Sequence, residues 1–190
     1  HKTVDDRPYG GGAGMVLKIE PIYKAVEAIS NKQYAVSQSK KSLKPKAYSL
    51  KKRTILLSAK GKIFTQKDAR RLVKYGQLIF ICGRYEGVDE RVARYVADEE
   101  ISIGNYVLFG GEVASMVIIE AVSRLISGVV QKEESIKNES FSDKKTKERE
   151  YPQYTRPEVF VVVGKKLKVP DVLLSGNHKK ISEWRKKHSG

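Results

Sequence analysis

Apolar and polar positions between residues 77 and 125 form two blocks, and each block predicts a buried strand followed by a loop or helix. An apolar run from Leu78 to Cys82 stops at a glycine-bounded loop, residues 83–87, as a strand does when it leaves a sheet. Residues 101–108 predict a second strand and its turn. Residues 110–124 then carry apolar side chains at three-and-four spacing, which predicts a helix. Because bare backbone lets a ligand approach closely, we expect both strand ends to line one cleft.

The preceding residues extend this alternation. Residues 16–29 predict a short strand and then an amphipathic helix that starts at Pro21, whereas residues 30–53 are polar and basic and predict a mobile excursion. Residues 54–58 predict a strand that is broken at 59–61, and Thr65 is a candidate N-cap for the next helix. Strands that alternate with helices indicate an α/β fold with a parallel sheet. Ligands bind beyond the carboxyl ends of such strands, where Ser58, Gly83 and Gly104 fall.

The character of the chain changes after residue 130. Residues 131–150 are almost wholly charged or polar, which is typical of a linker. Residues 151–190 predict a small second unit with a terminal helix over 181–187. So few residues bury little surface alone, and we expect this unit to dock on the first one or on a partner chain. The expected organisation is a domain over 1–130, a linker over 131–150 and a small domain over 151–190.

The formal net charge of +15 is carried mainly outside the proposed cleft. Residues 40–53 contain no acidic residue, and residues 164–190 hold eight Lys or Arg against two acidic residues. A polyanion such as RNA or DNA is the expected partner. A solvated surface or an anionic membrane is the alternative, although no basic amphipathic helix with an aromatic face favours the membrane.

Cysteine and histidine usage excludes several classes of site. The single cysteine, Cys82, lies within an apolar run and is expected to be a small buried hydrophobe, so a disulfide framework is excluded. The three scattered histidines offer no zinc-ligand spacing, and no metal site is predicted. No stretch approaches the roughly 20 apolar residues of a membrane span, and no signal peptide is visible. We expect a cytoplasmic protein without a membrane partner.

Residues 5–15 form a loop that is dense in glycine. Met15 occupies the place of the third glycine of a dinucleotide-binding fingerprint, and no lysine follows at P-loop spacing. The loop is therefore either a surface turn or a flexible lid near a ligand.

Six blocks, in this order, carry a resemblance to a known family: DDRPYGGGAGM, CGRYEGVDERV, SIGNYVLFGGE, NESF, YPQYTRPEVF and VLLSGNHKKISEWR. The sequence resembles the bacterial tRNA (guanine-37-N1)-methyltransferase family called TrmD from His1 almost to its end. The resemblance implies a SPOUT-class fold, in which the parallel α/β sheet contains a deep trefoil knot and precedes a small, mainly helical, tRNA-binding domain. It also implies a homodimer with shared active sites, S-adenosyl-L-methionine as methyl donor, and Mg²⁺ as an additional aid.

The resemblance implies a set of cofactor-binding residues in three segments. Most of them are expected to contact S-adenosylmethionine through backbone amides and carbonyls. The set is Leu56, Leu57, Ser58, Gly83, Glu86, Ile103, Gly104, Asn105, Tyr106, Val107, Leu108, Gly110 and Gly111.

Arg124 and Glu139 match the catalytic positions of the family. N1 of guanine bears a proton and is a poor nucleophile until that proton leaves, whereas a methyl group on a sulfonium is already activated. The reaction therefore needs a base near N1, matched by Glu139, and a cation near O6, matched by Arg124. Without the resemblance, Glu139 is typical of a solvated carboxylate and Arg124 of a partner for a helix C-terminus.

Departures from the family pattern keep other functions open. Glu139 stands where aspartate is usual, which adds a methylene and shifts the carboxylate. Family members also begin with a strand and a helix before the equivalent of His1, so we expect the chain to be truncated relative to them. One alternative is an RNA-binding relative that has lost catalysis. Another is a Rossmann-type oxidoreductase, which is disfavoured because no glycine fingerprint follows a strand.

Overall fold

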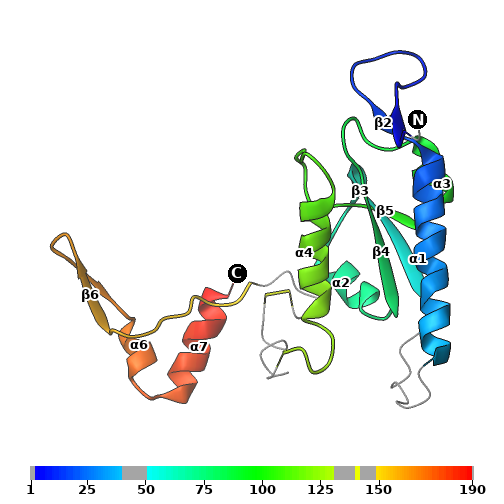
Figure 1. Cartoon of the computed structure of the whole chain (residues 1–190). Coiled ribbons are helices and arrows are strands. Elements are labelled where there is room, and N and C mark those ends of the chain that lie inside the picture. The colour runs from blue at the N-terminus through cyan, green and yellow to red at the C-terminus, as the bar shows by residue number, and fades with distance from the viewer. Residues whose placement is uncertain (1–2, 40–50, 131–139, 142–148, 190) are drawn as a thin grey trace. The chain divides into compact units, whose positions relative to one another are not determined.

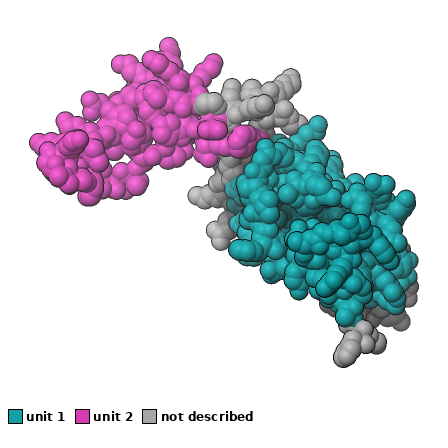
Figure 2. All heavy atoms as spheres, turned by 90° about the horizontal axis from the view of Figure 1, so that it is seen from above, with its two compact units in different colours: residues 1–130 teal, residues 131–190 magenta. Residues whose placement is uncertain are grey.

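The computed structural model describes residues 3–39, 51–130, 140–141 and 149–189. The chain divides into two compact units, unit 1 over residues 1–130 and unit 2 over residues 131–190 (Figure 2). Each unit is described by itself below.

Strands and helices alternate along unit 1, as the sequence predicts. The strands are β1 (Asp5–Asp6), β2 (Val16–Leu17), β3 (Lys52–Ile63), β4 (Gln77–Cys82) and β5 (Glu99–Ser102). The helices are α1 (Ile19–Ser39), α2 (Gln66–Leu72), α3 (Glu90–Tyr95) and α4 (Glu112–Ser123). Unit 2 holds β6 (Val159–Val162), β7 (Lys165–Lys168), α6 (Asp171–Leu174) and α7 (His178–His188).

Three of the strands form a parallel sheet in the order β4-β3-β5 (Figure 1). Ile55 of the central strand pairs with Phe80 of β4 on one side and with Glu99 of β5 on the other. Because all three strands run the same way, their carboxyl ends meet at one edge. The predicted parallel α/β sheet is confirmed, and this edge is where a ligand is expected.

Helices cover both faces of the sheet (Figure 1). On one face, α2 and α4 bury Leu72 and Ile118 against Ile55 and Leu57. On the other face, α3 buries Val92 against Leu56 and Ile81, and the first half of α1 packs beside them. Neighbouring residues of a strand point to opposite faces, so a central strand that is covered on both sides reads as a continuous apolar run.

Two boundaries differ from the sequence-based expectations. The predicted excursion over residues 30–53 is wrong at both ends, because α1 continues to Ser39 and β3 begins at Lys52; residues 40–50 lie outside the described residues. The predicted break at 59–61 is instead an irregularity within β3, where Leu57 and Lys62 both pair with Ile101. A Cβ on Gly61 would lie 2.6 Å from backbone atoms of Ile101. This glycine therefore marks a close approach of two strands and not a strand end.

Helix α4 is apolar on two sides. Its buried side carries Ala114, Ile118 and Val122, which face the sheet. The apolar spacing that predicted the helix includes Val113, Met116 and Val117, and these side chains are exposed. Met116 is 66% exposed. Unit 1 thus presents an apolar helix face that its own core leaves uncovered.

Helix α2 is held by a network of charged side chains at its first turns. As predicted, Thr65 is the N-cap. The Asp68 carboxylate accepts hydrogen bonds from the Thr65 backbone N–H at 3.2 Å and from the Thr65 hydroxyl at 2.7 Å. Asp68 also pairs with Lys62 and Arg71, and Arg71 reaches Glu99 at 2.7 Å. Burial opposes the charge on Asp68, yet the hydrogen bonds from Lys62, Thr65 and Arg71 lower its pKa to about 2.

The described residues of unit 2 include a β-hairpin and two helices. β6 pairs with β7 in antiparallel fashion, with Phe160 opposite Leu167. The predicted terminal helix is confirmed as α7 and begins three residues earlier than expected, after Asn177, whose side chain accepts a hydrogen bond from the Lys180 backbone N–H at 3.1 Å. The sequence analysis expected a mainly helical unit and did not predict this hairpin. Short apolar runs such as residues 159–163 do not distinguish strand from helix by periodicity alone.

Within the described residues, no helix is both long enough and apolar enough to cross a membrane.

Candidate active site

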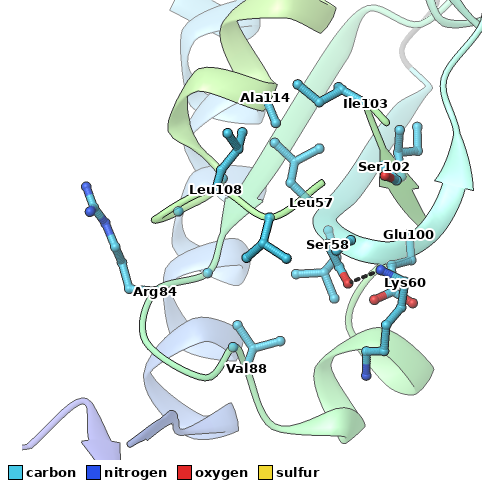
Figure 3. A pocket seen from close by; sticks show the side chains of 18 of the residues that line it. Leu57, Ser58, Lys60, Arg84, Val88, Glu100, Ser102, Ile103, Leu108 and Ala114 are labelled. Atoms are coloured by element: carbon cyan, nitrogen blue, oxygen red, sulfur yellow. Dashed lines mark hydrogen bonds between the residues drawn. The ribbon is translucent and has the colours of Figure 1, made fainter. Parts of the chain in front are cut away.

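A cavity of about 340 Å³ lies at the carboxyl ends of β4 and β5, beside the irregularity within β3 (Figure 3). Its walls come from three stretches that are far apart in sequence. These stretches are residues 56–60 at the bend of β3, residues 83–88 after β4, and residues 100–111 from β5 to the start of α4. The volume lies within the range of small-molecule sites in proteins. The topology thus produces a ligand-sized hollow at the edge where parallel sheets bind ligands.

The cavity brings together the residues that the sequence singled out as cofactor-binding, with one exception. Those that line it are Leu56, Leu57, Ser58, Gly83, Glu86, Ile103, Gly104, Tyr106, Val107, Leu108, Gly110 and Gly111. Asn105 is exposed and does not belong to the lining.

Backbone contacts fix the third stretch against the second. Gly111 donates its N–H to the carbonyl of Gly83 at 3.2 Å, and Arg84 forms an isolated antiparallel bridge with Gly110. A Cβ on Gly111 would lie 2.8 Å from the Cα of Cys82, a distance that side chains do not tolerate. Glycine is therefore required there for the two stretches to meet, and their contact forms one wall of the cavity.

The turn after β5 is held by two hydroxyl groups. Ser102 is buried, and its Oγ donates to the carbonyl of Gly104 at 2.9 Å while it accepts from the Gly104 N–H at 3.2 Å. Tyr106 donates its hydroxyl to the carbonyl of Ile103 at 3.3 Å. These bonds tie the turn to itself, so the cavity wall is largely preformed.

Two ion pairs involve charged residues that line the cavity. Lys60 and Glu90 approach to 3.1 Å, and Arg84 and Glu112 to 2.9 Å. A hydrogen bond from Lys60 lowers the pKa of the Glu90 carboxyl. All four side chains are about half exposed or more, so each pair contributes little to stability. Their role is to set the charge pattern at the opening, with both signs present.

Cys82 lies behind this wall, at the end of β4. It is half-buried and contacts the backbone at Gly111 without lining the cavity. Burial raises the pKa of its thiol. The predicted small hydrophobe is therefore in place, although it is less completely buried than expected.

The glycine-dense loop meets the cavity lining at one end. Glu86 donates its backbone N–H to the carbonyl of Met15 at 3.1 Å, and Leu17 forms an isolated bridge with Val88. Tyr9, at the other end of the loop, is fully exposed. This placement beside a lining residue fits a lid as well as a turn, so both interpretations stay open.

Of the two predicted catalytic residues, the structure describes Arg124, and Arg124 does not line the cavity. Arg124 is the half-buried C-cap of α4, and its backbone N–H donates to the carbonyl of Glu120 at 3.3 Å. Glu139 lies outside the described residues. Among the described residues, unit 1 therefore supplies the cavity without the expected cation, Arg124, in its lining.

Several lining residues escaped the sequence analysis. Arg84 and Tyr85 sit in the same glycine-bounded loop as Gly83 and could have been included on that ground. Glu90 and Ala93 come from α3, and Ala114 comes from α4. No sequence motif marks them, because only the fold brings these helices to the strand ends.

No group of three or more His, Cys, Asp or Glu side chains among the described residues is arranged to hold a metal ion.

Comparison with known proteins gives consistent matches along the chain. The profile of the family described as "tRNA (Guanine-1)-methyltransferase TrmD" matches residues 1–190. Three similar proteins, all called tRNA (guanine-N(1)-)-methyltransferase, come from Carboxydothermus hydrogenoformans, Geobacillus kaustophilus and Endomicrobium trichonymphae. They are 55%, 50% and 48% identical to this chain over 189 residues.

These alignments cover 100% of this chain but only 65%, 68% and 75% of the three relatives. The chain therefore spans about two thirds to three quarters of the relatives' length. Identity near one half over that span, together with the profile match over the whole chain, decides the family. This chain belongs to the tRNA (guanine-1)-methyltransferase TrmD family.

Proposed function

We propose that the chain transfers a methyl group from S-adenosylmethionine to N1 of guanosine 37 in tRNA. One observation carries the proposal: in a member of this family, residues predicted to bind the cofactor converge on one cavity at the strand ends. The names of its relatives, tRNA (guanine-N(1)-)-methyltransferase, give tRNA, guanine and the ring nitrogen N1, whereas position 37 comes from the family resemblance.

The cavity suits S-adenosylmethionine because much of its lining is backbone. Gly83, Gly104, Gly110 and Gly111 expose N–H and C=O groups without a Cβ in the way. Adenine can be recognised by such groups, while apolar walls such as Leu57 and Leu108 cover its ring faces. S-adenosylmethionine supplies a methyl group already activated by the sulfonium charge.

The proposed fold includes the deep trefoil knot of the SPOUT class. Its support is the way in which residues 103–111 return across the end of β4, held by the Gly111–Gly83 hydrogen bond and the Arg84–Gly110 bridge. Glycine at position 111 permits the tight crossing that such a path needs.

Arg124 and Glu139 have the charges that the chemistry needs. As the N1–C bond forms and the C–S bond breaks, the electron pair of that bond passes to sulfur, and the N1 proton must leave. Glu139 would take this proton as general base, and Arg124 would stabilise the negative charge that develops toward O6. Because Arg124 does not line the cavity of unit 1, it would complete the site from beyond the described lining.

A second copy of the chain would supply the missing part of the site. The exposed apolar face of α4, with Val113, Met116 and Val117, is the support for a homodimer, since monomeric proteins seldom expose a helix face of this kind. We propose that two copies pair through this face and share their active sites. Unit 2, with its excess of Lys and Arg, would hold the tRNA.

Methyl transfer to a defined tRNA tests the proposal directly. Labelled S-adenosylmethionine is incubated with a transcript that has guanosine at positions 36 and 37, and with the same transcript carrying adenosine at 37. We expect label on the first transcript alone. If tRNA binds but neither transcript is labelled, the chain is a catalytically silent RNA-binding relative and the proposed activity is wrong.

The catalytic roles need a separate measurement. In single-turnover experiments with saturating tRNA, Glu139→Gln and Arg124→Ala should each slow methyl transfer by about 10²-fold or more. Full activity of the Glu139→Gln variant would remove that residue as the base. A Met116→Lys variant should shift the chain from dimer to monomer in sedimentation velocity, and an unchanged dimer would place the interface elsewhere.

A further inference from the structure

A second cavity, of about 380 Å³, lies within unit 2 and has no part in the chemistry proposed above. Its walls come from residues 151–158, α6 and α7. Three of its lining side chains are aromatic, two are arginine, and the apolar ones include Leu173 and Ile181. A hollow of this size with aromatic walls and a few polar groups has the composition of a ligand site. The lining includes Tyr151, Tyr154, Arg156, Leu173, Trp184 and Arg185.

The aromatic rings at this cavity are set at an angle to each other. The rings of Tyr154 and Trp184 have centroids 6.2 Å apart and an interplanar angle of 61°. His188 stacks on Trp184 at 4.1 Å, and its ring nitrogen Nδ1 lies 2.8 Å from the Trp184 carbonyl oxygen. The indole is thus braced from its own helix, and Tyr154 meets it in a T-shaped contact while remaining 49% exposed. A flat ring system can stack on the exposed part of this aromatic pair.

A cation lies beside this aromatic pair. The guanidinium of Arg185 sits 4.7 Å from the centroid of the Tyr151 ring, which holds the charge at the wall of the cavity. Arg156 lines the same cavity and is exposed. Between residues 149 and 189, ten Lys or Arg stand against four Asp or Glu. The surroundings therefore attract a flat ring that is attached to negative charge.

We propose that this cavity binds one unstacked nucleotide of an RNA, with the base against Tyr154 and Trp184 and the phosphate near Arg185. Aromatic rings interleaved with arginine are the usual means by which proteins hold single-stranded nucleotides. A peptide partner of matching charge would be acidic, but it would have no use for the angled ring pair. The proposal rests on the proposed function only in taking RNA as the ligand, because the site lies in unit 2 and not at the sheet.

Trp184 is the only tryptophan in the chain, so its fluorescence reports on this cavity alone. The full chain is titrated with a hexanucleotide of adenosine and with a hexamer of abasic ribose phosphates, which has the same charge and no bases. We expect saturable quenching by the adenosine hexamer and little by the abasic one. Equal binding of both without quenching would overturn the proposal, because simple charge attraction would then suffice.

A matched pair of variants separates the cavity from the general positive charge. Arg185→Gln and Lys186→Gln remove the same charge from neighbouring positions of α7, but only Arg185 lines the cavity. We expect Arg185→Gln to weaken binding of the adenosine hexamer by about fivefold or more and Lys186→Gln by about twofold or less. Equal losses would overturn the proposal. Because Arg185 is exposed, its replacement should leave the unit folded, which circular dichroism checks.

Methyl transfer distinguishes this inference from the proposed function. If tRNA is methylated but the hexamers fail to quench Trp184, the nucleotide site is wrong and the enzyme assignment stands. If quenching follows the expected pattern without any methyl transfer, the nucleotide site stands and the catalytic proposal falls.

Discussion

The two units of this chain solve the problem of burying apolar side chains in different ways. Among its described residues, unit 1 buries twelve hydrophobic residues between a sheet and its helices, and the largest fully buried side chains are Ile55, Leu56, Leu72, Val92 and Ile118. In unit 2, none of the described residues is buried, and its apolar side chains meet around a cavity or lie on the surface of a hairpin. The comparison teaches that sequence hydrophobicity alone does not make a core. Helices on both faces of a sheet do, whereas the described hairpin and helices of unit 2 leave their apolar side chains partly or fully exposed.

Hydrogen exchange should show the largest contrast between the units. Backbone amides in the β3–β4 ladder open only when unit 1 unfolds, whereas those of α7 and β6 have little buried surface above them. We expect amides of the ladder to exchange on the order of a thousandfold more slowly than those of unit 2. Similar protection in both units would mean that unit 2 is covered in solution, and would contradict the contrast in burial between the two units.

A cavity in the core of unit 1 should cause the next largest effect. Ile118 is fully buried on the sheet side of α4, so Ile118→Ala is expected to lower the free energy of unfolding by about 2–5 kcal/mol. Ile119, the next residue, is 46% exposed, so Ile119→Ala is the matched control. It is expected to lower the free energy of unfolding by about 1 kcal/mol or less. Urea unfolding followed by far-ultraviolet circular dichroism measures both variants. Equal costs would show that the exposed face of α4 is as well packed as the buried one.

The charged network of α2 should contribute a smaller, pH-dependent amount. The Asp68 side chain is 4% exposed, and its pKa is lowered from 3.8 to about 2 in the folded chain. A lowered pKa stabilises the fold above the unfolded value, and this gain is lost as the pH falls from about 4 toward 2. Asp68→Asn should therefore cost about 2 kcal/mol at pH 7 and make stability less steeply dependent on pH below 4. Urea unfolding at pH 7 and at pH 3 measures this, and equal pH dependence in the variant and the parent chain would contradict it.

Truncation of an apolar residue in unit 2 should have the smallest effect. Leu173 lines the second cavity from α6 and is only partly buried, so Leu173→Ala is expected to cost less than about 1 kcal/mol. Trp184 fluorescence follows unfolding of this unit separately from unit 1. A cost comparable to that of Ile118→Ala would show that unit 2 has a tightly packed core after all.

The sequence predicted the strands and helices of unit 1 where one strong local signal decided the structure. The run from Leu78 to Cys82 indicated a buried strand because a glycine-bounded loop ends it, and Thr65 with Asp68 marks a helix start through specific hydrogen bonds. The cavity was predictable as well, since strand ends of a parallel sheet must meet. The apolar spacing of α4 indicated a helix but not its buried side, because a helix that is apolar on two sides fits either orientation.

Other features depend on contacts between segments that are distant in sequence. Gly61 looks like a strand breaker, and only the nearness of Ile101 in space shows that the strand continues. Glu90 and Ala93 of α3 line the cavity because of how the helix packs, and no sequence motif marks them. For Arg124 and Glu139, the roles came from family resemblance, and they stay predictions until the kinetic variants are measured.

The position of Cys82 has a chemical consequence for a protein proposed to bind an alkylating compound. Sulfur attacks a methyl sulfonium as thiolate and not as thiol, and burial raises the pKa of this thiol, which reduces the thiolate fraction at neutral pH. The contact of its Cα and Cβ with Gly111 also keeps the residue behind the cavity wall. The only strong soft nucleophile in the chain would therefore stay inert toward the methyl donor, and the protein would avoid methylating itself.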